Sequence, residues 1–192
     1  MQTAASIHPG TIIILNGASS SGKTTLLRAL QETLPEPYLD AGVDRFIWML
    51  PKRYLDRPLW DEVLGLATHA GLAGHTLFSG MHQAIAALSR SGNNVLVEPV
   101  WLRQLAELLA DLPAYLVGVV CPLAVLEQRE RWRKDRTLGQ ARAQYPVVHA
   151  HCLYDLEVDT SCHNPIECAT QVVERVKNGT PEALAKIRKG YG

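Results

Sequence analysis

The sequence predicts a single α/β domain over residues 1–192, a three-layer fold built on a five-stranded parallel sheet. Apolar, β-branched runs alternate with segments of helical periodicity, which is the rhythm of parallel strands joined by helical crossovers. The runs lack apolar–polar alternation, as expected of strands covered by helices on both faces. A chain of 192 residues, 47% of them hydrophobic, is also long enough to close one core.

Five runs are expected to form the strands, and helical patterns lie between them. The expected strands are residues 11–15, 38–43, 94–98, 115–121 and 154–158. The first expected helix starts within residues 22–25 and runs to about residue 34, where Pro35 ends it. The other expected helices are residues 76–91, 102–112, 123–134, 138–150 and 165–177. The polar segment after Gly179 is expected to form a short terminal helix that docks loosely or not at all.

The least regular region lies between Pro51 and Gly74. Pro, Trp, Tyr and Gly residues occur there without a sustained period. We interpret residues 48–75 as a substrate-facing insertion, and a surface loop without a role is an equally good interpretation.

Charge and composition restrict the partners. Acidic and basic residues balance at 19 each, so no overall field favours nucleic acid or an anionic membrane. No apolar run is long enough to cross a bilayer, and the first residues do not resemble a signal peptide. We therefore expect a cytoplasmic protein. Its irregularly spaced cysteines are expected to be free thiols rather than disulfides or zinc ligands: Cys121, Cys152, Cys162 and Cys168.

The segment GASSSGKT follows the first expected strand and precedes the first expected helix. This is the P-loop pattern in its usual context, in which backbone N–H groups and the helix N-terminus surround phosphate oxygens. Lys23 is expected along the β- and γ-phosphates of ATP, and Thr24 on Mg²⁺. The expected nucleotide-binding residues here are Gly17, Ala18, Ser19, Ser20, Ser21, Gly22, Lys23, Thr24 and Thr25. A flexible serine–glycine turn would not require the lysine and the hydroxyl.

Glu98 ends the third expected strand, which should lie beside the P-loop strand. Its carboxylate could reach Mg²⁺ through water or help to hold the acceptor. The alternative is that Glu98 simply closes the strand.

A basic run carries three arginines at spacings of four and three residues: Arg129, Arg133 and Arg136. On one helix they would share a side. We expect Arg129 to bind the nucleotide, and Arg133 and Arg136 to stabilise the transferred phosphate from a lid over residues 129–140, which Gly139 allows to bend. A solvated helix face is the alternative.

Asp40 and Asp44 flank the end of the second expected strand, at the same sheet edge as the P-loop. A carboxylate there can orient and deprotonate an acceptor hydroxyl. Asp44, which begins a helical stretch, is the better candidate for this base, and it could also be a helix N-cap.

These residues resemble the chloramphenicol phosphotransferase family of P-loop kinases. The resemblance covers most of the chain and rests on the P-loop and on more particular segments: Gly42-Val43-Asp44, Asp135-Arg136 and Tyr154-Asp155-Leu156-Glu157-Val158-Asp159-Thr160. It implies a fold similar to nucleoside monophosphate and shikimate kinases, with Asp44 matching the family's proposed base. It also implies transfer of the γ-phosphate of ATP to a small-molecule hydroxyl, with antibiotic inactivation as one such role. In this fold the adenine usually lies between the lid arginines and the loop after the last strand, here residues 159–164.

Two other functions fit part of the pattern. A nucleotide-sugar kinase similar to the zeta toxins would share the P-loop and the aspartate. A nucleotide-dependent binding module would bind ATP with little turnover.

Overall fold

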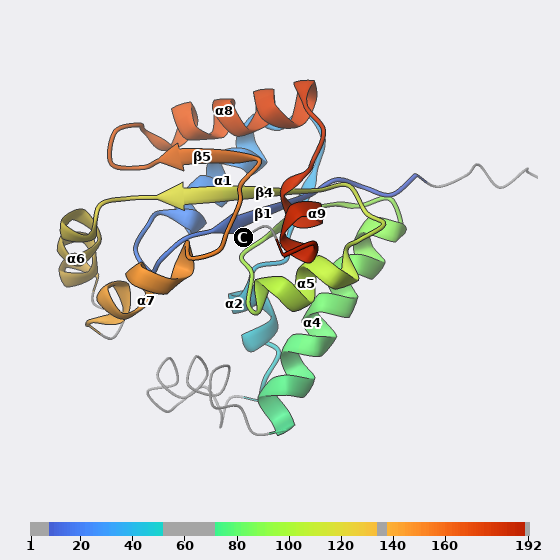
Figure 1. The fold of residues 1–192 in the computed structure, drawn as a ribbon, viewed down its shortest axis with the longest axis horizontal. Helices are drawn as coiled ribbons and strands as arrows, with labels where there is room; N and C mark the ends of the chain where they lie inside the picture. Colours follow the sequence, from blue (N-terminus) through green and yellow to red (C-terminus); the bar gives the residue numbers. More distant parts are fainter. Residues whose placement is uncertain (1–7, 52–71, 134–137, 191–192) are drawn as a thin grey trace, which may run out of the picture.

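The computed structural model describes residues 8–51, 72–133 and 138–190. It contains a five-stranded parallel sheet in the order β2-β3-β1-β4-β5, which confirms the predicted fold class (Figure 1). The strands are β1 (Ile12–Asn16), β2 (Tyr38–Asp40), β3 (Asn94–Val97), β4 (Ala114–Val120) and β5 (Leu156–Asp159).

Strand β1 lies at the centre of the sheet and pairs with both β3 and β4. Residues Ile12 to Leu15 have no exposed surface, because helices cover both faces of the sheet. β2 and β3 lie on one side of β1, and β4 and β5 lie on the other. The connections therefore change direction at β1, and ligands of open α/β sheets bind beside such a switch point, at the carboxyl ends of the strands. The P-loop leaves β1 at this edge.

Two layers of helices enclose the sheet (Figure 1). Helices α1 (Lys23–Thr33) and α8 (Pro165–Asn178) pack over one face. Helices α4 (Leu72–Arg90), α5 (Leu102–Leu108) and α9 (Ala183–Arg188) pack over the other. Two helices follow the carboxyl ends of strands: α2 (Val43–Ile47) follows β2, and α6 (Leu123–Trp132) follows β4. Helix α7 (Gln140–Val148) comes after α6. The carboxyl edge is therefore where functional side chains can gather.

The terminal helix α9 is docked, so the expectation of loose docking is wrong. Ala183, Leu184 and Ile187 are buried in the core cluster on the α4 side. Asp155 fixes the start of the helix, since its Oδ1 accepts the N–H groups of Glu182 at 2.7 Å and Ala183 at 3.1 Å. The apolar residues of this short, otherwise polar segment fall on one side, and that side packs onto the sheet.

Helix α6 ends earlier than predicted. Its last residue is Trp132, and the following Arg133 has an extended backbone with φ −85° and ψ 122°. One helix therefore does not carry all three arginines: Arg129 lies within α6, Arg133 follows it, and Arg136 lies outside the described residues.

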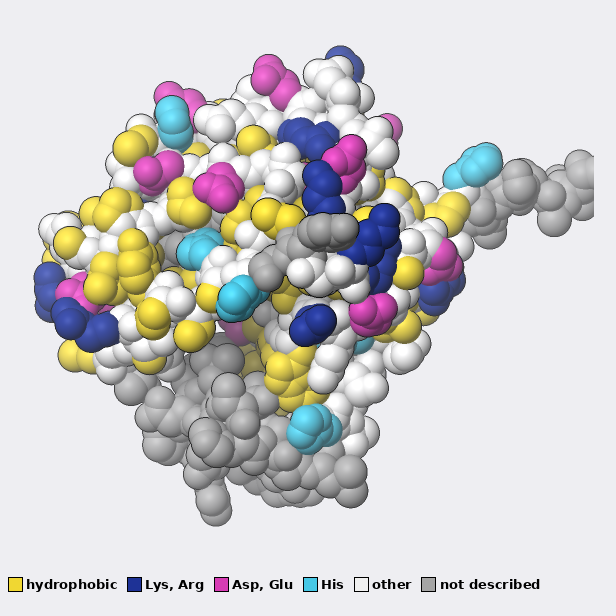
Figure 2. All heavy atoms as spheres, viewed as in Figure 1, with side chains coloured by type: hydrophobic (Ala, Val, Ile, Leu, Met, Phe, Trp, Pro, Cys, Tyr) yellow, Lys and Arg dark blue, Asp and Glu magenta, His cyan; other side chains and the backbone are white. Residues whose placement is uncertain are grey.

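Among the described helices, none is both long and apolar enough to cross a bilayer. On the face shown in Figure 2, acidic and basic side chains are interspersed, in keeping with the balanced composition.

Candidate active site

The P-loop is a tight turn between β1 and α1. Ser20 and Gly22 have left-handed backbones, with φ values of 63° and 93°. A Cβ atom on Gly17 would lie 2.5 Å from the carbonyl oxygen of Val119, so only glycine fits where the loop passes β4. The sequence therefore places glycines where the backbone requires them.

The three serine hydroxyl groups of the P-loop are buried without hydrogen-bond partners. Four buried side-chain oxygens in the described part of the chain lack a hydrogen bond, and three of them are the Oγ atoms of Ser19, Ser20 and Ser21. A buried polar group without a partner is costly. Such a cluster beside a helix N-terminus fits a ligand rich in acceptor oxygens, such as the phosphates of a nucleotide.

Lys23 and Thr24 begin α1 at the inner side of the loop. The Lys23 Nζ donates to the carbonyl oxygens of Gly17 at 2.8 Å and Ala18 at 2.9 Å. The Thr24 Oγ1 donates to the Glu98 Oε1 at 3.0 Å. The structure thus brings Glu98 to the P-loop threonine, where a carboxylate and a hydroxyl offer the oxygen ligands that Mg²⁺ prefers.

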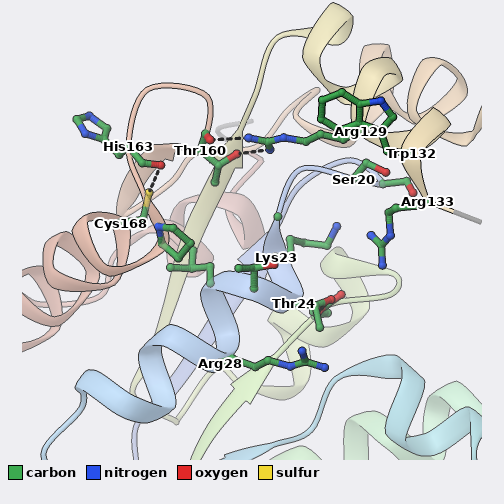
Figure 3. A pocket seen from close by; sticks show the side chains of 16 residues that line it. Ser20, Lys23, Thr24, Arg28, Arg129, Trp132, Arg133, Thr160, His163 and Cys168 are labelled. Carbon is green, nitrogen blue, oxygen red and sulfur yellow. Dashed lines mark hydrogen bonds between the residues drawn. The ribbon is translucent and has the colours of Figure 1, made fainter.

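A pocket of about 580 Å³ opens beside the P-loop (Figure 3). Figure 3 shows Lys23, Thr24 and Arg133 reaching toward the same space from α1 and from the residue after α6. The predicted residues Ser19, Ser20, Gly22, Lys23, Thr24, Thr25, Glu98, Arg129 and Arg133 line it, together with Leu26, Arg28, Trp132, Thr160, His163, Pro165 and Cys168.

Arg129 joins α6 to the loop after β5. Its guanidinium donates to the Thr160 Oγ1 at 3.0 Å and to the Thr160 carbonyl oxygen at 2.7 Å. Thr160 in turn donates from Oγ1 to the Ser21 carbonyl oxygen at 2.7 Å. Sequence reasoning assigned residues 159–164 to the adenine region but did not single out Thr160, because a threonine in a polar loop carries no distinguishing signal.

Asp44 lies in the first turn of α2, where Gly42 is the N-cap, so the alternative that Asp44 caps the helix is wrong. The turn adjoins Glu98, since a Cβ atom on Gly42 would lie 3.9 Å from the Glu98 Cγ. Asp44 is not among the residues that line the pocket beside the P-loop.

The carboxylate of the neighbouring Asp40 accepts hydrogen bonds from the turn that follows β2. Its Oδ1 accepts the Gly42 N–H at 3.0 Å, and its Oδ2 accepts from the Arg45 Nε at 2.7 Å. These bonds also explain why β2 ends at Asp40, three residues before the predicted end.

The expected acceptor insertion lies largely outside the described residues, which stop at Pro51 and resume at Leu72. Trp48 and Met49 lead into it with 64% and 73% of their surface exposed. The described edge of this region is therefore apolar and accessible.

Glu130 fixes the start of α7 although it is 3% exposed. Its Oε2 accepts the Gly139 N–H at 2.8 Å, and its Oε1 accepts the Ala141 N–H at 3.0 Å. Gly139 itself is the N-cap of α7 and has a φ of 96°, which favours glycine. A glutamate within a run of charges gives no sequence signal for this role.

A second pocket, of about 590 Å³, is lined by Asn16 and Pro99, the sequence neighbours of Gly17 and Glu98. Asn16 donates from Nδ2 to the Tyr154 hydroxyl at 2.8 Å, and the His149 Nδ1 lies 2.7 Å from that hydroxyl. Burial raises the pKa of Tyr154 and lowers the pKa of His149, so both side chains are neutral near pH 7. This cluster fixes the chain between α7 and β5 beside β1.

The profile of the family described as "Chloramphenicol phosphotransferase-like protein" matches residues 10–177. The chain belongs to this family. It is 32% identical over 206 aligned positions to a protein named "Putative O-phosphotransferase" in two strains of Mycobacterium tuberculosis, and the alignment covers 97% of this chain and 92% of the relative.

Solved structures of kinases share the fold of this family member. A shikimate kinase from Acinetobacter baumannii in complex with shikimate has a TM-score of 0.60 at 17% identity and covers 90% of this chain and 94% of its own. The Mycobacterium tuberculosis APS kinase in complex with AMPPNP and APS has a TM-score of 0.57 at 17% identity, with coverages of 89% and 99%. At this identity the likeness shows the fold alone. Together with the family, it identifies the chain as a small-molecule kinase.

Proposed function

We propose that the protein is an ATP-dependent O-phosphotransferase that moves the γ-phosphate of ATP to a hydroxyl group of a small molecule. The observation that carries this proposal is the convergence at the P-loop: Lys23 and the Thr24–Glu98 pair beside serine hydroxyls that are buried without partners. Each of these groups suits a triphosphate with a divalent cation.

Side chains around the pocket are proposed to bind the phosphates and to offset their negative charge during phosphoryl transfer. Lys23, whose ammonium group donates to the loop carbonyls, is proposed to bind the β- and γ-phosphates, and Arg133, which lines the same pocket, is proposed to contact them as well. Thr24 and Glu98 would hold Mg²⁺, Glu98 directly or through water. When bound, Mg²⁺ neutralises phosphate charge. Arg136 is proposed to join Arg133 on the transferred group.

The base of the nucleotide is proposed to lie between α6 and the loop after β5. Arg129, bonded to Thr160, lines the pocket together with Trp132, His163 and Pro165. Planar guanidinium and aromatic groups are well suited to stack on a base.

Asp44 is proposed as the base that orients and deprotonates the acceptor hydroxyl. Asp44 lies in the turn of α2 that begins at Gly42, which adjoins Glu98, and this supports the role. The bonds of the Asp40 carboxylate to Gly42 and Arg45 support it too, because they leave Asp44 as the better candidate. Ionised carboxylates at this edge are suited to accept the proton that the hydroxyl loses.

The acceptor is proposed to be an aromatic or otherwise apolar alcohol such as chloramphenicol, the substrate after which the family is named. The exposed Trp48 and Met49 and the second pocket, with Trp101, Leu102 and Val148 in its wall, offer apolar surface for it. Phosphorylation of an antibiotic hydroxyl would inactivate the drug.

Transfer to chloramphenicol and to a panel of small alcohols, followed by mass spectrometry, tests this proposal. We expect one phosphorylated product from the natural chain and at least a hundredfold slower formation by Asp44→Asn, on the scale of general base catalysis. Asp40→Asn is the matched control and should keep most of the activity. Tight ATP binding without any phosphorylated acceptor would instead indicate a nucleotide-dependent binding module.

A further inference from the structure

One peptide group of the P-loop, between Ala18 and Ser19, is held from two opposite sides. The Ala18 carbonyl oxygen accepts from the Lys23 Nζ at 2.9 Å, and the Ser21 N–H also reaches it at 3.2 Å. The Ser19 N–H of the same peptide donates to the Oε1 of Gln144 at 2.6 Å. In a trans peptide the oxygen and the N–H point in opposite directions, so Gln144 supports this peptide from the side that faces away from Lys23.

Gln144 is placed by a helix that is fixed near both ends. At its start, the buried carboxylate of Glu130 accepts the Gly139 and Ala141 N–H groups. At its end, the Val148 carbonyl oxygen accepts from the Asn16 Nδ2 at 2.8 Å. Asn16 directly precedes the P-loop, so this bond holds α7 beside the loop that contains Ser19, the partner of Gln144.

We propose that Gln144 is a positioning residue for Lys23, a role that rests on the proposed function of Lys23 in phosphate binding. The glutamine carboxamide fixes the rotation of the Ala18–Ser19 peptide, and the peptide's carbonyl oxygen then faces the lysine ammonium group. Without the Gln144 acceptor the peptide is fixed through its carbonyl oxygen alone, so it is freer to rotate about its flanking bonds. The ammonium group then loses the Ala18 carbonyl oxygen, one of the acceptors that place it.

A double-mutant cycle with AMP-PNP separates this role from simple packing. Gln144→Met keeps the size of the side chain and removes the acceptor oxygen. We expect it to weaken AMP-PNP binding, measured by calorimetry, by about tenfold in the natural chain and by less than about twofold in a Lys23→Met background. Gln104→Met, at an exposed glutamine of α5, is the matched control and should bind like the natural chain. An equal loss in both backgrounds, or no loss in either, would overturn the proposal.

Hydrogen exchange at the Ser19 amide, followed by NMR in the natural chain, provides a test that needs no variant to fold. We expect this amide to be protected in the nucleotide-free protein, and exchange as fast as in an unstructured peptide would contradict the proposal. Both readouts are independent of phosphate transfer. If the double-mutant cycle shows no coupling but the enzyme still transfers phosphate, the role of Gln144 is wrong and the proposed function is unaffected.

Discussion

Glu98 is the acidic residue that the structure places at the P-loop threonine, 3.0 Å from its hydroxyl. If it helps to hold Mg²⁺, the change Glu98→Gln keeps the shape of the side chain and removes the charge that attracts the ion. We expect the Mg²⁺ concentration that gives half-maximal ATP turnover to rise about tenfold or more. Glu107→Gln, at an exposed glutamate of α5, is the control, and an unchanged Mg²⁺ titration for Glu98→Gln would exclude the metal role.

Arg129 makes two charge-assisted hydrogen bonds to Thr160, at 3.0 and 2.7 Å. We expect Arg129→Met to weaken ATP binding by about tenfold, since the wall beside the proposed base site loses its connection to α6. Calorimetric titration with ATP measures the change. Arg131→Met, two residues along the same helix and exposed, should bind ATP like the natural chain, and equal affinities for the two variants would contradict the assignment.

The predicted residues that line the pocket belong to the contiguous P-loop motif, to the end of β3 (Glu98) and to the basic run after β4 (Arg129 and Arg133). Each of them carries a signal in its own segment, because residue type and position after a strand together indicate its place. Thr160 and Gln144 were missed, since their P-loop partners lie 139 and 125 residues away in sequence. Threonine and glutamine are common in polar loops and helices, so only the folded chain reveals these contacts.

Helix α7 depends on one buried carboxylate. Glu130 accepts two N–H groups at the start of the helix, which would otherwise lack partners. We expect Glu130→Gln to lower the free energy of unfolding by about 1–3 kcal/mol, because an amide can accept only one of these bonds with its oxygen and places N–H groups against the other. Urea denaturation measures the loss.

The matched control for this prediction is Glu174→Gln, at an exposed glutamate of α8. We expect this variant to unfold at the same urea concentration as the natural chain. A Glu130→Gln variant with that same midpoint would show that the carboxylate does not hold α7.

Most elements were predicted to within a few residues, and the errors have local causes. β2 ends early because the Asp40 carboxylate turns the chain at Gly42. Helix α6 ends at Trp132, although its charged sequence continues a helical pattern. The docking of α9 was missed because its polar composition conceals the buried Leu184 and Ile187, and because its anchor, Asp155, lies 27 residues upstream of its first partner.

At the scale of the whole molecule, two histidines make stability depend on pH. Burial lowers the pKa of His82, whose Nε2 lies 2.9 Å from the Val100 carbonyl oxygen, and also that of His149. In the unfolded chain an imidazole takes up a proton near pH 6.5, so the unfolded state binds more protons at mildly acidic pH. We therefore expect the free energy of unfolding to fall as the pH drops below about 6.5, by at most about 1.4 kcal/mol per pH unit for His82.

Urea denaturation between pH 7.5 and 5.5 measures this dependence. His82→Gln removes one titrating group and keeps a donor for the Val100 carbonyl oxygen, so its stability should vary less with pH. His8→Gln, at an exposed histidine, is the control. Identical pH profiles for the natural chain and His82→Gln would contradict the account.

The sheet order places the ends of β1 and β3 side by side and the P-loop at the switch point between β3 and β4. Alternation of apolar strands and helices, read together with the P-loop, was enough to predict a three-layer fold on a five-stranded parallel sheet. The full strand order is seen only in the structure. The acceptor could not be predicted in the same way. The segment expected to face it, residues 48–75, shows no periodic pattern that links residue type to position.

Phosphorus NMR of the protein with Mg²⁺, ATP and chloramphenicol or another alcohol tests the central claim most directly. The account predicts a phosphate monoester signal that grows as ADP forms, is lost in Lys23→Met and persists in Lys177→Met, an exposed lysine of α8. ADP formation with inorganic phosphate as the sole product for every alcohol tested, or monoester formation unchanged in Lys23→Met, would contradict it.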